Sequence, residues 1–165
     1  HLQPVLDTLR YLVKETAVLT EITTLLIPGH NDSDDELSRL SDFVARELSP
    51  EVPLHFSAFH PDYRMTDVPP TPPATLQRAR RIALSAGLRY VYTGNIHDPV
   101  GGTTSCAGCG TALIVRDYYK ILQYRLDKTG RCAQCGHAPP GHFAAECGQF
   151  GRRRLPVRMS QNEQL

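Results

Sequence analysis

The sequence predicts an α/β fold, namely the C-terminal part of a (β/α) barrel followed by a small four-cysteine metal ribbon. Two observations predict it. Helix-type and strand-type hydrophobic patterns alternate along the first hundred residues, and two CxxC motifs follow in the last third of the chain. The chain has 165 residues, of which 41% are hydrophobic, and this is enough for about one globular domain. We expect residues 1–100 to form the barrel part, 101–143 the metal ribbon and 144–165 a disordered tail.

The first half of the α/β part contains two predicted helices and one predicted strand. Residues 1–18 carry Leu or Val at steps of three and four, which predicts a helix with one apolar stripe. Residues 20–27 are apolar and β-branched and predict a buried strand, which Pro28 and Gly29 end. Ser33 precedes Glu36 by three positions, and this capping box begins a second helix that reaches residue 48.

The second half repeats the same order of elements. It contains a predicted strand at 52–59, a proline-rich loop at 61–72, a helix at 73–86 and a strand at 89–93. Strands that alternate with helices across short linkers give right-handed crossovers and a parallel sheet. Parallel strands need cover on both faces, and three strands with three helices leave an open edge. Because the chain also begins with His1 and not Met, we expect it to be the last part of a larger α/β protein.

Four of the five cysteines predict a metal site. Cys106 and Cys109 form one CxxC motif, Cys132 and Cys135 form the other, and a glycine follows each motif. Two such turns on a short hairpin place four sulfurs at the corners of a tetrahedron, which suits Zn²⁺. Iron in a rubredoxin-like site uses the same geometry, and an iron–sulfur cluster is a third option. The residues between the motifs contain two predicted strands, at 112–115 and 121–126.

Polar side chains follow all three predicted strands of the α/β part, at the end of the sheet where such proteins bind their ligands. The histidines at these positions are His30, His60 and His97. Together with nearby aspartates they would form a metal or acid–base cluster. The alternative is that the neighbouring polar residues only form caps and turns. These residues are Asn31, Asp32 and Asp98. His55 lies inside a predicted strand and is interpreted as a packed histidine.

Four segments carry a resemblance to a known family. They are residues 22–32 (ITTLLIPGHND), 52–61 (VPLHFSAFHP), 69–73 (PPTPP) and 86–95 (AGLRYVYTGN). Together with the two CxxC motifs they resemble radical S-adenosylmethionine (SAM) enzymes of the pyruvate formate-lyase-activating type. The closer resemblance is to the radical SAM enzyme of the AmmeMemoRadiSam system, and it covers roughly residues 1–143.

The resemblance implies a partial barrel of the radical SAM type, in which a [4Fe–4S] cluster on a CxxxCxxC loop reductively cleaves SAM to a 5′-deoxyadenosyl radical. It implies that His60 helps to hold the adenosine of SAM, and that the loop of Pro28, Gly29, Asn31 and Asp32 lies near this cofactor. The chain contains no CxxxCxxC motif. We therefore expect that motif upstream of the chain, and the chain alone to be inactive.

The resemblance also implies a zinc-ribbon-like extension at the two CxxC motifs, with Zn or Fe as the metal. The implied partners are the Memo-like and AMMECR-type proteins of the same system, and the implied substrate is a protein or a small molecule.

Charge and composition argue against several other classes of protein. The formal net charge of +1 gives no argument for nucleic acid or anionic lipid, and no apolar run is long enough to span a bilayer. Without a signal-peptide core or a disulfide framework, we expect a cytoplasmic protein, with Cys147 as a spare thiol. The alternative function is a non-enzymatic zinc-ribbon module for interaction or nucleic-acid binding, which the arginine-containing tail mildly favours.

Overall fold

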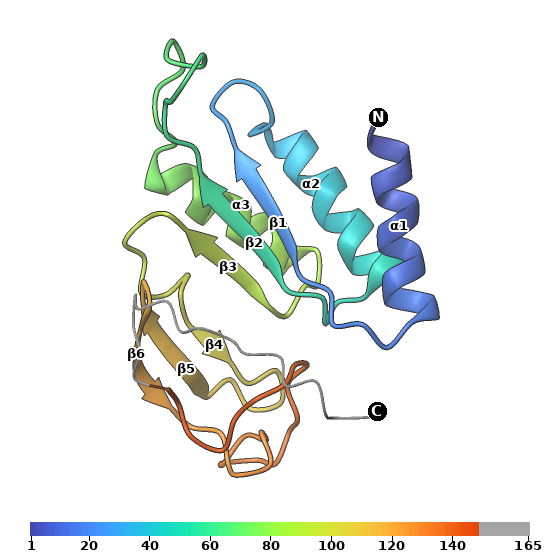
Figure 1. Ribbon diagram of the computed structural model, residues 1–165, viewed down its shortest axis with the longest axis vertical. Coiled ribbons are helices and arrows are strands. Elements are labelled where there is room, and N and C mark those ends of the chain that lie inside the picture. The colour runs from blue at the N-terminus through green and yellow to red at the C-terminus, as the bar shows by residue number, and fades with distance from the viewer. Residues whose placement is uncertain (149–165) are drawn as a thin grey trace, which may run out of the picture.

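The computed structural model describes residues 1–148, which contain two small sheets (Figure 1). The first sheet carries the helices and the second is the ribbon. The elements of the α/β part are α1 (Leu2–Glu15), β1 (Ile22–Leu26), α2 (Asp34–Asp42), the π-helix η1 (Phe43–Leu48), β2 (Leu54–Ala58), α3 (Pro73–Ser85) and β3 (Val91–Gly94). Those of the ribbon are β4 (Thr104–Ser105), β5 (Ala112–Asp117) and β6 (Lys120–Tyr124). The predicted mixed α/β class is confirmed. No helix within residues 1–148 combines the length and apolar composition needed to cross a bilayer.

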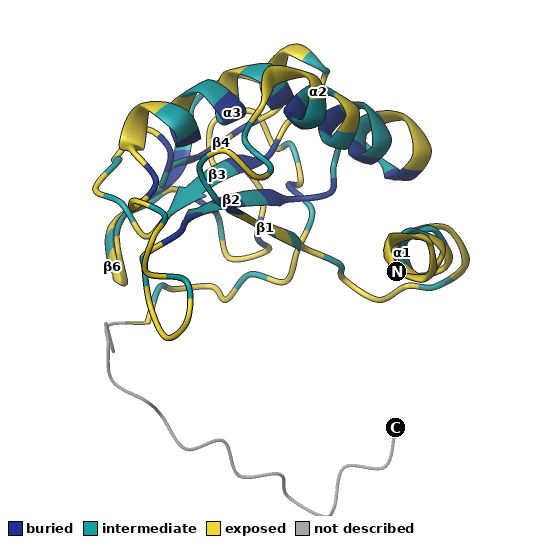
Figure 2. Ribbon diagram, turned by 90° about the horizontal axis from the view of Figure 1, so that it is seen from above, coloured by how far each residue is buried: buried dark blue, intermediate teal, exposed yellow. Residues whose placement is uncertain are grey.

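The first sheet is parallel, with its strands in the order β1-β2-β3. Leu54 on the central strand lies opposite Ile22 on one side and Val91 on the other. Helices α2 and α3 cover one face of this sheet, as the view in Figure 2 shows. Their contact with the strands forms the main core, in which Leu26, Phe56 and other apolar side chains are fully buried. Burial of this kind contributes roughly 1.5–3 kcal/mol for each large side chain.

The opposite face of the parallel sheet is largely uncovered. Alternate residues of a strand point to opposite faces, so the neighbours of the core residues point this way. On β1, Thr23 is exposed and the side chain of Leu25 is 45% exposed. His55 and Ser57 on β2 are half-buried. The predicted open arrangement of three parallel strands is therefore present in the fold.

Helix α1 stands beside the sheet and makes its contact with η1 (Figure 2). The Arg10 side chain links the two elements, because it pairs with Glu47 at 2.5 Å and lies 5.0 Å from the centre of the Phe43 ring. The apolar stripe predicted for this helix is only partly buried. Leu2 and Val5 are 70% and 54% exposed, so the outer end of the stripe has no cover in the described part of the chain.

The second predicted helix differs from the structure in its last third. The backbone N–H of Ser49 donates to the carbonyl of Val44, five residues back, and residues 43–48 form a π-helix instead of continuing α2. The hydrophobic pattern could not predict this change. Val44 and Leu48, the buried residues of this turn, are four positions apart, and this spacing fits an α-helix equally well.

The ribbon is an antiparallel sheet in the order β4-β5-β6. Its small core consists of Leu113, Ile114 and Leu126, packed with Cys106 and Cys132. The two predicted strands correspond to β5 and β6, with boundaries that shift by one or two residues. Strand β4 was not predicted, because two residues are too few to give a pattern. Most of the tail predicted for residues 144–165 lies outside the described residues.

Candidate functional site

The four cysteines of the two CxxC motifs converge on one point. Their sulfur atoms all lie within 4.8 Å of one another. Cys106 Sγ is 3.5 Å from Cys135 Sγ, and Cys109 Sγ is 3.8 Å from Cys132 Sγ. Zn–S bonds of about 2.3 Å in a tetrahedron place the sulfurs about 3.8 Å apart. The arrangement therefore fits a single ion such as zinc or iron. A cubane cluster fits less well, because each thiolate would then bind a different iron and the sulfurs would be further apart.

The backbone builds both halves of this centre in the same way. The N–H of Gly110 donates to the carbonyl of Cys106 at 2.8 Å, and that of Gly136 donates to the carbonyl of Cys132 at 2.8 Å. Both glycines have a φ of +74°, a conformation that a residue with a Cβ rarely adopts. This repeated turn is the geometry that the two CxxC-Gly patterns predicted.

The centre is half-exposed, and its thiols differ in acidity. Cys106 and Cys132 are buried, whereas Cys109 and Cys135 are exposed. The hydrogen bond between Cys109 Sγ and the Thr111 hydroxyl, together with the backbone of Thr111, lowers the pKa of Cys109 to about 6. The backbone N–H of His137 lowers the pKa of Cys135, but the three neighbouring thiols outweigh it and raise that pKa to about 12. All four thiols lose their protons when they bind one ion, and the cation offsets the crowding of negative charge that this creates.

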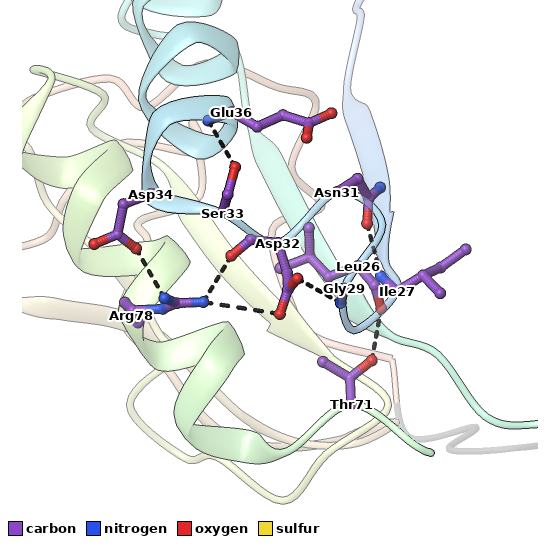
Figure 3. Close-up of polar contacts among 10 residues, drawn as sticks. All are labelled: Leu26, Ile27, Gly29, Asn31, Asp32, Ser33, Asp34, Glu36, Thr71 and Arg78. Carbon is purple, nitrogen blue, oxygen red and sulfur yellow. Dashed lines mark hydrogen bonds and ion pairs between the residues drawn. The ribbon is translucent and has the colours of Figure 1, made fainter. Parts of the chain in front are cut away.

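The Pro28–Asp32 loop after β1 uses its polar side chains to hold its own shape (Figure 3). The Asn31 side chain accepts from the N–H of Ile27 at 2.7 Å and donates to the carbonyl of Leu25 at 2.9 Å. Asp32 Oδ1 accepts from the N–H of Gly29 at 2.8 Å. Gly29 has a φ of +74°, which favours glycine at this turn. Asn31 and Asp32 therefore act as turn formers here, the alternative that the sequence left open.

An arginine of α3 fixes the same loop from outside. Arg78 donates to the carbonyl of Asp32 at 2.7 Å and to the carboxylate of Asp34 at 2.8 Å (Figure 3). It also lies 3.9 Å from Asp32 Oδ2. The sequence analysis missed this residue. Its position on α3 gave no signal, because the contact joins residues more than forty positions apart.

Thr71 joins the carboxyl ends of β1 and β2. Its hydroxyl donates to the carbonyl of Leu26 at 2.6 Å and accepts from the N–H of Phe59 at 2.9 Å. The side chain is buried, and its own backbone N–H donates to the carbonyl of Phe59 at 3.0 Å. The sequence analysis also missed Thr71, because it lies in a proline-rich loop where a single threonine has no pattern. It fixes the two strand ends that carry the loops of the candidate site.

The predicted cluster of three histidines is not formed. His97 turns toward the ribbon, where its Nδ1 lies 3.2 Å from a carboxylate oxygen of Asp117. His30 and His60 are exposed at the ends of β1 and β2. Within residues 1–148 the four cysteines are the one group of His, Cys, Asp or Glu side chains close enough to share an ion. The hypothesis was wrong because the loop after β3 connects directly to the ribbon.

His55 is packed, as the sequence predicted, although it lies outside the main core. It lies on the uncovered face of the sheet, half-buried, with its ring stacked on Tyr92 at 4.9 Å between centroids. Its Nε2 is 3.2 Å from a carboxylate oxygen of Glu21. The alternation of β2 places its side chain opposite Phe56, away from the core.

Comparison with known proteins identifies a similar protein of greater length. No model of a known protein family matches the chain. Over 136 residues the chain is 47% identical to a protein of Methanocaldococcus jannaschii named Uncharacterized protein MJ0808. The alignment covers 82% of this chain and 40% of that protein, so the chain spans well under half the length of this curated relative.

Proposed function

We propose that this chain is the C-terminal part of a radical SAM enzyme of the AmmeMemoRadiSam type. The main support for this proposal is the parallel sheet. Its three strands follow in sequence order, helices cover one face, and the other face is left open. A parallel sheet that is stable in water is normally covered on both faces. The open face and the exposed stripe of α1 are the surfaces that further strands and helices of a partial barrel would cover.

The length of the M. jannaschii relative supports the same proposal. More than half of that protein lies outside the region that matches this chain, which leaves room for the missing strands. Within the proposed enzyme, the loops after β1 and β2 lie at the carboxyl end of the sheet, where barrel enzymes bind their ligands.

The chain's own residues define what it would contribute to SAM binding. His60 is exposed at the end of β2 and is free to donate or accept a hydrogen bond with the adenosine. The loop that contains Gly29 and Asn31 is held by Arg78 and its own hydrogen bonds, so it would present a fixed rim. When bound, SAM and its cluster supply the radical chemistry. The cluster itself does not fit the cysteines of this chain, because four of the five converge on a single-ion geometry.

The four-cysteine centre has a structural role in this proposal. With Zn or Fe bound, it would fold the ribbon, whose core is too small to be stable alone. The Memo-like and AMMECR-type proteins remain the proposed partners.

Expression of the complete reading frame that encodes this chain allows the proposal to be tested. Protein expressed from that frame, reconstituted with iron and sulfide and then reduced, should form 5′-deoxyadenosine from SAM, whereas the 165-residue chain should form none. A variant of the complete protein with its CxxxCxxC cysteines replaced by alanine is the matched control. A reading frame without a CxxxCxxC motif would contradict the proposal and favour the non-enzymatic ribbon module.

A further inference from the structure

The two CxxC turns of the four-cysteine centre repeat each other beyond the bonds made by their glycines. The N–H of Cys106 donates to the carbonyl of Thr111 at 2.8 Å, and the N–H of Cys132 donates to the carbonyl of His137 at 2.8 Å. Thr111 and His137 each lie two residues after the second cysteine of their motif. Since these backbone hydrogen bonds match, a difference between the two halves of the centre has to come from side chains.

In both halves the side chain at this position reaches across to the other turn. A Cβ added at Gly108 would lie 3.2 Å from His137 Cβ, so the histidine packs directly on the first turn. The Thr111 hydroxyl donates to Gln134 Oε1, in the second turn, at 2.6 Å. Gly108 and Gln134 are both the third residue of a CxxC motif. His137 Nε2 makes no hydrogen bond within residues 1–148, so one half contributes packing and the other contributes hydrogen bonds.

The Thr111 hydroxyl lies between the Gln134 amide and one of the four sulfurs. Its oxygen is 3.3 Å from Cys109 Sγ. A hydroxyl has a single proton and cannot donate in both directions. While Cys109 is a thiol, the S–H donates to the hydroxyl and the hydroxyl donates to Gln134.

Binding of an ion reverses the direction of these hydrogen bonds. Cys109 loses its proton when it becomes a ligand, and a thiolate can only accept. A hydrogen bond to a charged acceptor is roughly twice as strong as one between neutral groups, so the hydroxyl proton should turn to the sulfur. The Gln134 side chain is exposed and carries an NH₂ group as well as a carbonyl. Rotation of its amide then supplies a donor to the Thr111 oxygen.

We propose that Thr111 and Gln134 form a hydrogen-bond relay to the metal centre, in which the Gln134 amide donates to the Thr111 hydroxyl and the hydroxyl donates to the Cys109 thiolate. Hydrogen bonds of this kind offset the negative charge of a ligand and tune the bound metal. The alternative is a clasp, in which the pair only holds the two turns together. The relay depends on the four-cysteine centre and not on the proposed radical SAM function.

Cobalt(II) is a suitable probe, because its thiolate complexes absorb light by charge transfer from sulfur to metal. Cobalt is titrated anaerobically into the reduced 165-residue chain. Thr111→Val should weaken cobalt binding about ten-fold. It should also move the charge-transfer band to longer wavelength, because a thiolate without a hydrogen bond gives up electron density more easily. Thr111→Ser keeps the hydroxyl and should match the wild type.

Thr103→Val is the matched control for the threonine variants. The Thr103 hydroxyl donates to the carbonyl of Pro99 and not to a cysteine, so both band and affinity should stay at the wild-type values. A wild-type chain that binds no cobalt would overturn the relay together with the metal centre.

Variants of Gln134 distinguish the relay from the clasp. Gln134→Ala breaks the link between the turns but leaves the hydroxyl free to donate to the sulfur, so the band should not move. Gln134→Glu offers only acceptor oxygens at neutral pH and holds the hydroxyl away from the sulfur. It should shift the band in the same direction as Thr111→Val, and because position 134 is exposed it should fold even if the valine variant does not.

Two results would overturn the relay. The first is a wild-type band in Gln134→Glu, or in a folded Thr111→Val variant. The second is a band shift in Gln134→Ala as large as that in Thr111→Val, which would show that the pair acts as a clasp.

Discussion

Replacing Thr71 with valine is expected to destabilise the α/β part strongly, although the two side chains have almost the same shape. The change removes the hydroxyl that donates to the carbonyl of Leu26 and accepts from the N–H of Phe59. Both backbone groups lie beside the core, where water cannot easily replace the lost hydrogen bonds. Thr71 itself is only 4% exposed.

The magnitude follows from the two backbone groups that would lose their partner. Leaving one buried donor or acceptor unpaired costs about 1–3 kcal/mol, so two such groups give roughly 2–6 kcal/mol for Thr71→Val. In a protein of this size, this corresponds to a fall in melting temperature of about 4–24 °C. Thr71→Ser keeps the hydroxyl and removes one methyl group, and it should cost roughly 1 kcal/mol.

Urea unfolding of the metal-loaded chain, followed by circular dichroism of the helices, measures both variants. Amide hydrogen exchange at residues 27–32 and 59–63 gives a second readout, because these loops leave the strand ends that Thr71 joins. Faster exchange is expected in Thr71→Val alone. A valine variant within about 0.5 kcal/mol of the wild type would refute the reasoning, since the hydroxyl would then contribute nothing net.

Three further predictions concern the ribbon and the proposed SAM site. Cys132→Ser should abolish binding of one metal equivalent, seen by elemental analysis, and unfold the ribbon, whereas Cys147→Ser should do neither. Asp127→Asn should lower the melting temperature of the ribbon at neutral pH, with Lys128→Gln as control. Hydrogen bonds from the backbone of Arg131 and from Thr129 hold the pKa of Asp127 below its usual range. Its contribution is therefore present above the ordinary carboxyl pKa and lost as the pH falls through the lower folded value, so the variant should lose less stability in acid. In the complete protein, His60→Ala should weaken SAM binding about five- to a hundred-fold, and His30→Ala should leave the dissociation constant unchanged.

Sequence patterns were enough to predict those features that depend only on neighbouring residues along the chain. The predicted N-cap at Ser33 is present, because the Ser33 hydroxyl accepts from the N–H of Glu36. The two CxxC-Gly turns adopt the same backbone geometry, since each needs only five consecutive residues. The strands were found because β-branched and apolar residues cluster in short runs.

Contacts between distant residues could not be predicted in this way. Arg78 holds a loop more than forty positions earlier, and Thr71 reaches Leu26 across 45 positions. Neither residue type has a pattern that reports such a partner. The same limit explains the error over His97, because its position after β3 says nothing about the ribbon carboxylate of Asp117 that it meets.

The separation of the two cores decides how loss of the metal should act on the rest of the chain. The ribbon core around Leu113 shares no buried residue with the sheet core around Phe56. The contacts between the parts are polar or aromatic, such as the hydrogen bond of 3.0 Å between the hydroxyls of Tyr92 and Thr104. Contacts of this kind contribute about 1 kcal/mol each, far less than either core.

Removing the metal should therefore unfold the ribbon while β1, β2 and β3 stay paired. The sheet would still change at one place, because the Tyr92 hydroxyl would lose its hydrogen bond to Thr104. Chelation followed by hydrogen exchange should show fast exchange in residues 104–135 and retained protection in residues 54–58. Loss of protection throughout the sheet would show instead that the two parts fold as one unit.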